Sequence, residues 1–210
     1  WDTDCNAGNV GTILGVAVGP QGIDECYRGP INDEIVLSGI SGYLNILDIP
    51  SYSKKLFGLA CRLAGEECPE PPAQDGTLHY DFTLPGATHG FHVSDPIRCM
   101  AQVSPEHGGS LRCFYEKLIR GEGFNLFVKT FYRRRDFDDE RYMPVFSPLA
   151  YPGQTASFTV ALERLHGDQL SLTPYVKETF TGREILLKPV VFSDSFDSQT
   201  LSFTLPDVEG

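Results

Sequence analysis

The chain has 210 residues and a formal net charge of −11, and a surface with this charge repels the phosphates of nucleic acids. We therefore exclude DNA and RNA as partners. With 41% hydrophobic and 21% charged residues, the composition is typical of a globular protein with a buried core. The 21 glycines and 15 prolines divide the chain into short segments, which favours many short strands over long helices.

The first half of the chain predicts a series of strands. Residues 10–18 form an apolar run that we expect to be a strand, weakened by its glycines. No helical periodicity extends over four turns in this half, and residues 116–120 are its best short helical candidate. Residues 78–84 alternate apolar and polar side chains, as a strand with one buried face does. The other strand-like runs are residues 34–40, 42–49, 54–60, 91–103 and 111–119.

The second half begins near Gly121, just after the last cysteine, and predicts a new set of strands. These strands recur about every ten residues with turns between them, as in a β-sandwich. The predicted fold is all-β, with a sandwich over residues 1–120 and a second, cysteine-free sandwich-like domain over residues 121–210. The runs of the second half are residues 124–132, 156–165, 169–180, 184–192 and 200–205.

Six cysteines, all in the first half, predict disulfide bonds. Their even number and the absence of Cys-x-x-Cys spacing favour disulfides in an oxidising compartment over a zinc site. Reduced thiols in a cytosolic core are the alternative, and spacing alone does not choose among the many pairings. Because the chain begins at Trp1 rather than methionine, we also expect a processed mature chain. The cysteines are residues 5, 26, 61, 68, 99 and 113.

Several short motifs occur in order along residues 1–120. They are Trp1-Asp2-Thr3-Asp4-Cys5, the run 13–18, the close pair Cys61 and Cys68 followed by Pro69, then Gly76, Tyr80, Leu84-Pro85 and Leu111-Arg112-Cys113-Phe114. In this order and spacing the chain resembles the ML lipid-recognition family, which includes the Niemann-Pick type C cholesterol-transfer protein and the ganglioside activator protein. The resemblance does not extend to residues 121–210.

This resemblance implies an immunoglobulin-like sandwich of two antiparallel sheets, splayed enough to hold a lipid and without catalytic chemistry. It also implies a bond between the first and last cysteines, Cys5 and Cys113, and one between Cys61 and Cys68. Cys26 and Cys99 are then left to pair with each other.

The residues that could line a lipid pocket are apolar side chains expected to face the interior of the first sandwich. The same residues would serve as an ordinary packed core, because alternation shows only that they face inward. They are Leu44, Ile46, Phe57, Leu59, Tyr80, Phe82, Phe91, Ile97, Met100, Phe114 and Leu118.

Two charged or polar motifs are interpreted as structural. His89 and His92, with Asp95 nearby, are expected to lie on a solvated loop, because odd spacing along a strand would separate the two imidazoles. Residues 133–135 are three arginines, which we expect to pair with the acidic residues of the 136–141 segment rather than with an anionic head group. No nucleophile, phosphate-loop or dinucleotide motif is present, so we expect no enzyme, metal or cofactor.

We therefore predict a secreted lipid-binding or lipid-transfer module that holds a lipid or other apolar small molecule between two sheets. In this interpretation residues 121–210 form a docking surface for a protein partner, and the protein makes transient contact with a membrane surface. The alternative is an extracellular adhesion or receptor-binding ectodomain, in which solid sandwiches bind a protein partner through their loops.

Overall fold

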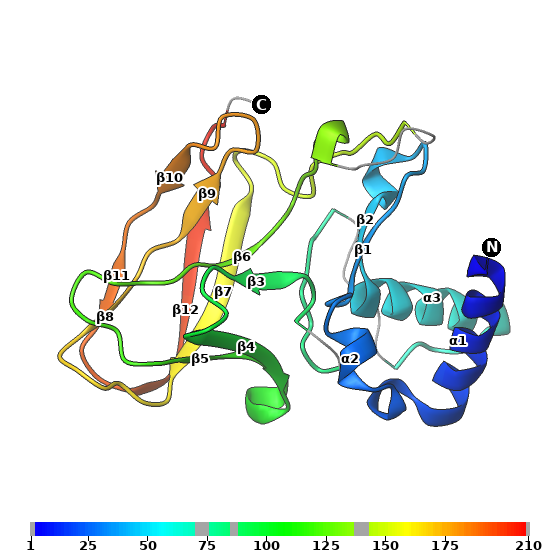
Figure 1. The fold of residues 1–210 in the computed structure, drawn as a ribbon, viewed down its shortest axis with the longest axis horizontal. Coiled ribbons are helices and arrows are strands. Elements are labelled where there is room, and N and C mark those ends of the chain that lie inside the picture. Colours follow the sequence, from blue (N-terminus) through cyan, green and yellow to red (C-terminus); the bar gives the residue numbers. More distant parts are fainter. Residues whose placement is uncertain (1–2, 70–75, 85–87, 137–142, 209–210) are drawn as a thin grey trace.

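The computed structural model of the chain describes residues 3–69, 76–84, 88–136 and 143–208. Its described residues contain more strand than helix, which confirms the prediction of a β-rich fold (Figure 1). The helices are α1 (Asp4–Val18), α2 (Glu25–Arg28) and α3 (Ile49–Ala64). The strands are β1 (Glu34–Val36), β2 (Ile46–Asp48), β3 (Phe91–Val93), β4 (Cys99–Ser104), β5 (Ser110–Tyr115), β6 (Leu126–Val128), β7 (Thr155–Leu162), β8 (Leu170–Leu172), β9 (Tyr175–Lys177), β10 (Glu184–Leu186), β11 (Val190–Phe192) and β12 (Phe196–Thr204).

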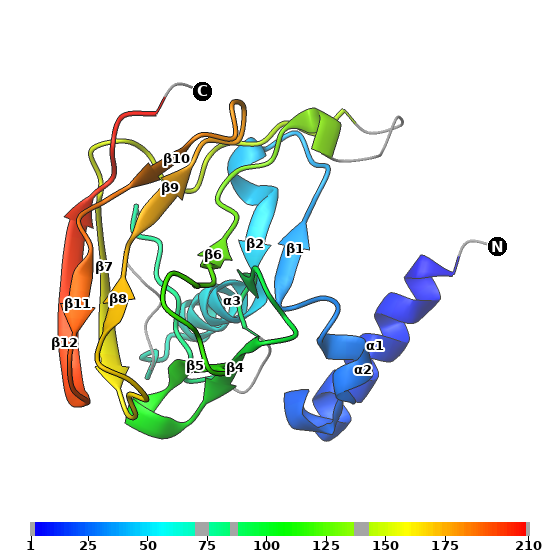
Figure 2. The same ribbon diagram turned by 60° about the vertical axis from the view of Figure 1, so that its left-hand side comes forward.

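These strands form two-stranded antiparallel sheets: β1 pairs with β2, β3 with β6, β4 with β5, β7 with β12, β8 with β11 and β9 with β10. The pairs β7–β12, β8–β11 and β9–β10 lie together and form one layer of the molecule (Figures 1 and 2). The pairs β3–β6 and β4–β5 lie opposite this layer, and the helices lie beyond them with β1 and β2.

Residues 10–18 are not the predicted strand but the greater part of helix α1, which starts at Asp4. The run has no neighbouring strand, and a segment without one can satisfy its backbone groups internally only as a helix. The chain leaves the helix at Gly19, whose φ of 67° lies in the region that glycine adopts most readily. None of the side chains of α1 is buried.

Residues 54–60 are also helical, as part of α3. The Asp48 side chain accepts a hydrogen bond of 3.3 Å from the Ser51 N–H and so caps the start of the helix. Gly65, with a φ of 73°, ends the helix, and the Glu66 N–H returns to the Cys61 carbonyl at 2.9 Å. The prediction of strands throughout the first half was therefore wrong here. Residues 78–84 are not a strand either, and residues 116–120 are not helical.

The predicted disulfides are not confirmed, because all six cysteines are free thiols. Cys5 and Cys26 are exposed on α1 and α2. Cys99 and Cys113 lie on the paired strands of the β4–β5 hairpin. Burial, and to a lesser extent the neighbouring Cys99 thiol, raises the pKa of Cys113 to about 11. Burial and the adjacent Cys68 thiol raise the pKa of Cys61.

Hydrogen bonds and ion pairs connect the two predicted domains. Strand β3 pairs with β6 across the predicted boundary, and Arg112 lies 2.5 Å from Glu163. The Tyr132 hydroxyl donates to Glu34 at 2.7 Å. These contacts bring strands from both halves together, although the division into residues 1–120 and 121–210 stays a prediction.

Asn45 anchors the loop between β1 and β2 to the second half. Its side chain is 2% exposed, accepts from the Gly39 N–H at 3.0 Å, and donates to the carbonyls of Gly39 and Val145 at 2.6 and 2.7 Å. Asn45→Ala leaves these buried groups unpaired, so we expect it to lower the free energy of unfolding by roughly 2–4 kcal/mol.

Urea denaturation followed by circular dichroism measures this loss. Asn9→Ala, at an exposed site of α1, is the matched control and should change the free energy of unfolding by less than about 0.5 kcal/mol. Equal stability of the Asn45→Ala variant and the unmodified chain would contradict the anchoring role.

Candidate ligand-binding cleft

One wall of the candidate site is the pair β7–β12, whose two faces differ in chemistry. Ala156 pairs with Phe203 and Phe158 with Leu201, so these four apolar side chains share one face. Phe158 and Phe203 contact each other edge to face, with ring centroids 6.1 Å apart. The opposite face carries serines and threonines, so the apolar face is the one available for burial.

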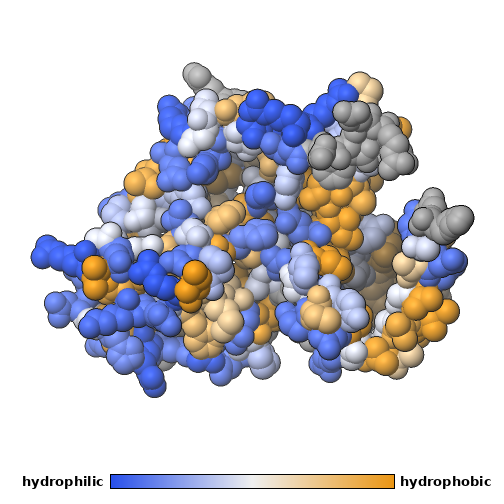
Figure 3. Space-filling view, in the orientation of Figure 1, coloured by the Kyte–Doolittle hydropathy of each residue, from blue (hydrophilic) through white to orange (hydrophobic). Residues whose placement is uncertain are grey.

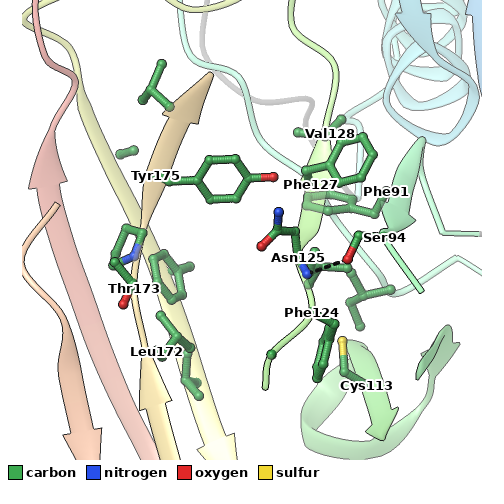
Figure 4. Close-up of a pocket in the computed structure, with 18 of the residues that line it drawn as sticks. Phe91, Ser94, Cys113, Phe124, Asn125, Phe127, Val128, Leu172, Thr173 and Tyr175 are labelled. Atoms are coloured by element: carbon green, nitrogen blue, oxygen red, sulfur yellow. Dashed lines mark hydrogen bonds between the residues drawn. The ribbon is translucent and has the colours of Figure 1, made fainter. Parts of the chain in front are cut away.

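The opposing wall is formed by β6 with the residues just before it. Phe124, Phe127 and Val128 line this wall, and Phe91 of β3 adjoins them because β3 pairs with β6 (Figure 4). The position of Asn125 is set by its backbone, whose N–H donates to the Ser94 hydroxyl at 2.8 Å.

A group of aromatic rings, which also lines the cleft, adjoins this wall. Tyr80 contacts Phe91 edge to face at 5.0 Å between centroids, and Phe82 lies 5.9 Å from Phe91. Burial raises the pKa of Tyr80, and the nearby carboxylates of Asp48 and Glu34 raise it further. The Tyr80 hydroxyl is therefore uncharged at neutral pH.

Between the two walls lies a cleft of about 3520 Å³. Typical ligand pockets have volumes of roughly 300–1,000 Å³, so this cleft has room for a large molecule or for several. Figure 4 shows Leu172, Thr173 and Tyr175 on one side and Phe124, Asn125 and Phe127 on the other, with the space between them.

The segment that carries Tyr80 and Phe82 is held to helix α3 by an ion pair. Lys54 of α3 binds the Asp81 carboxylate, which also accepts a hydrogen bond of 2.9 Å from the Thr83 N–H. Burial by itself raises the pKa of Asp81, but the hydrogen bonds from Lys54 and Thr83 outweigh it and hold the pKa at about 2.

A histidine–aspartate pair lies beside the aromatic rings. His89 is 1% exposed, and its Nδ1 is 2.7 Å from an Asp48 carboxylate oxygen. Within the described residues its Nε2 has no hydrogen-bond partner, and its φ of 54° is rare for a residue other than glycine. The Phe82 ring packs against the imidazole at 4.9 Å, and His89 is not among the residues that line the cleft. The prediction of a solvated loop is therefore wrong for His89, which is buried.

The arginine-rich segment pairs in part with its own acidic residues. Arg133 binds Asp136 with a closest distance of 2.7 Å, and this contact lowers the pKa of Asp136 to about 2. The rest of the acidic segment, residues 137–141, lies outside the described residues, as do Trp1, Asp2 and Pro85 of the family motifs.

Five of the predicted ligand-binding residues line the cleft: Tyr80, Phe82, Phe91, Phe114 and Leu118. The other six are elsewhere: Leu44, Ile46, Phe57, Leu59, Ile97 and Met100. Ile46 is buried in β2, whereas Ile97 is 90% exposed in a turn, and Phe57 and Leu59 of α3 are half-exposed. The cleft therefore does not lie inside residues 1–120.

Sequence analysis missed the wall formed by residues 156–162 and 200–205. The alternation of apolar and polar residues in these runs is the signal that could have found it. Alternation identifies the apolar face of a strand. It does not identify the element that packs against this face, and the two runs therefore belong to a separate domain in the prediction from sequence.

Comparison of the chain with family models, with curated proteins and with solved structures found no match. Within the described residues, no helix combines the length and the apolar character that crossing a bilayer requires. The same residues contain no group of three or more histidine, cysteine, aspartate or glutamate side chains placed to hold a metal ion.

The low pKa of Asp81 makes the attachment of the aromatic segment sensitive to acid. A carboxylate whose pKa falls from an ordinary 3.8 to about 2 on folding stabilises the fold above pH 4, and this contribution disappears as the pH falls to about 2. We expect Asp81→Asn to destabilise the protein at about pH 6 and to have much less effect at about pH 2.

Urea midpoints at both pH values measure this difference. Asp207→Asn, which removes an exposed carboxylate, is the control and should shift the midpoint little at either pH. If the urea midpoints of the unmodified chain and of Asp81→Asn differ by the same amount at both pH values, the ionised Asp81 carboxylate does not stabilise the segment.

Proposed function

We propose that this protein binds lipids or similar apolar molecules in the cleft between β7–β12 and β6. The observation that carries the proposal is the cleft itself, which is large and has aromatic and aliphatic side chains on both walls. Ligand sites in proteins are concave and mostly apolar. The two walls of this cleft carry such apolar side chains, and charged residues such as Lys117, Glu122 and Asp168 also line it.

The hydrophobic effect supplies enough free energy for binding. Burial of ~300–400 Å² of ligand surface at ~25 cal/mol per Å² contributes about 8–10 kcal/mol before the costs of association. Useful affinity therefore requires few polar contacts.

The exposed area of the chain supports the same proposal. The solvent-accessible surface is 15075 Å², whereas a compact monomer of 23.2 kDa exposes about 9,700 Å². The open cleft accounts for part of this difference, and an apolar ligand inside it would remove that surface from water.

The proposal also covers the type of β-fold and the cellular compartment of the protein. We propose that the opposing β layers act as a splayed sandwich, as the resemblance to the ML lipid-recognition family implies, but with one layer supplied by residues 155–204. We also propose a secreted protein in an oxidising compartment, where the adjacent thiols of Cys61 and Cys68 are the pair best placed to oxidise.

A second candidate function, binding of a protein partner, is favoured by the exposed apolar residues of α1. Ile13 is 67% and Val16 86% exposed, and apolar side chains gather over this helix in Figure 3. This is the interpretation in which the molecule acts through its surface rather than through the cleft.

A bulky residue inside the cleft tests the lipid proposal. Ala156 faces the cleft on β7, so Ala156→Trp should reduce binding of a fluorescent fatty-acid probe by about tenfold or more while the protein stays folded. Native mass spectrometry of the unmodified protein incubated with mixed-lipid vesicles should show bound lipid.

Ser202→Trp is the matched control, because Ser202 lies next to Phe203 on β12 and faces away from the cleft. It should leave probe binding unchanged, with folding of both variants checked by circular dichroism. If neither probe nor lipid binds the unmodified chain, the lipid proposal fails and the surface of α1 becomes the better candidate.

A further inference from the structure

Two polar side chains point into the cleft from its opposite walls. The Tyr175 hydroxyl extends from β9 across the space toward β6, and the Asn125 carboxamide extends from the residue before β6 into the same space (Figure 4). Apolar side chains lie near both: Phe124 precedes Asn125, which is itself exposed, and Leu172 lies on the wall that carries Tyr175.

The hydrogen bonds of the described residues leave both polar groups without a protein partner. Within the described residues, neither the Tyr175 hydroxyl nor the Asn125 carboxamide makes a hydrogen bond to the protein. The backbone of Asn125, in contrast, is fixed at both ends, because its N–H donates to the Ser94 hydroxyl and its carbonyl accepts from the Ser94 N–H at 2.9 Å. The main chain of Asn125 is thus fixed next to β3, while its carboxamide makes no hydrogen bond within the described residues.

The charged group that acts on Tyr175 is a carboxylate. Burial raises the pKa of Tyr175, and the negative charge of Glu184 on the neighbouring strand raises it further, so the hydroxyl is an uncharged donor. Of the cations that line the cleft, Arg112 binds Glu106 at 2.9 Å and Arg133 binds Asp136. Within the described residues Lys117, Arg120 and Arg164 also line it and make no ion pair, so a carboxylate probe is part of the test.

We propose that Asn125 and Tyr175 bind the head group of the ligand, and that this head group is a neutral hydrogen-bonding group such as a lipid alcohol or amide. This inference rests on the proposed function, because it assigns the polar end of the same site. The carboxamide both donates and accepts, and the phenol donates, so together they match a hydroxyl, which also does both. The apolar remainder of the ligand lies between the β7–β12 face and β6.

The test uses the full chain and three probes of one chain length: an n-alkane, the corresponding primary alcohol and the corresponding carboxylate. Their affinities are measured by displacement of a neutral fluorescent apolar probe. Two neutral hydrogen bonds should make the alcohol bind roughly tenfold more tightly than the alkane. The carboxylate, at neutral pH, should bind more weakly than the alcohol.

The variants Asn125→Leu and Tyr175→Phe should each weaken alcohol binding by roughly three- to tenfold and leave alkane binding unchanged. Asn9→Leu and Tyr43→Phe, at exposed positions outside the cleft, are the matched controls and should change neither affinity.

The outcomes separate the two proposals. If all three probes bind and the alcohol has no advantage, or if the carboxylate binds most tightly, the head-group assignment is overturned while lipid binding stands. Equal loss of alkane and alcohol binding in the variants would also overturn it, because the residues would then act only by packing. If no probe binds the unmodified chain, the proposed function fails and the head-group assignment fails with it.

Discussion

The structure depends on two apolar β faces that are turned toward each other without meeting. The face of β7–β12 that carries Phe158 and Phe203 opposes the wall around Phe127, and a cleft of about 3520 Å³ separates them. In most sandwiches such faces interdigitate and exclude water. Here Phe127, Phe158 and Phe203 stay partly exposed, and under the proposed function a ligand in the cleft would bury the remaining apolar surface.

Polar contacts rather than a continuous core hold the remaining elements around this space. Lys54 and Asp81 attach the aromatic segment to α3, and Asn45 connects the β1–β2 loop to the second half. Such contacts are directional, so each places a particular segment at a particular position. Loss of a buried partner leaves the other group unsatisfied, which makes these contacts costly to break.

The apolar surface proposed for binding lies in two separate places, the cleft and the exposed side chains of α1. The cleft is enclosed on two sides, and a mobile small molecule can fill it, whereas the side chains of α1 are open to solvent and can be covered only by a surface of similar extent. The two proposed modes of binding therefore use separate parts of the chain. A protein with both would carry an apolar cargo in the cleft and contact a partner through α1.

The β character of the chain could be predicted from sequence, because alternation in runs such as 156–162 depends only on local pattern and has a period that strands impose. The same reasoning failed at residues 10–18 and 54–60, where short apolar runs fit both helix and strand. For α3 the deciding signals were present, since Asp48 and Pro50 begin the helix and Gly65 ends it. For α1 the deciding factor was the lack of a strand partner, which no local pattern reveals.

By itself, then, the sequence determined the acidic net charge and, in runs such as 156–162, which side chains of a strand share a face. Only the tertiary structure decided which faces oppose each other. Tyr80, Phe82 and Phe91 were recognised as inward-facing, but their partners in the cleft, including Phe158 and Tyr175, are more than sixty residues away along the chain. Contacts over such separations arise from the packing of whole layers, and periodicity within a strand carries no information about that packing.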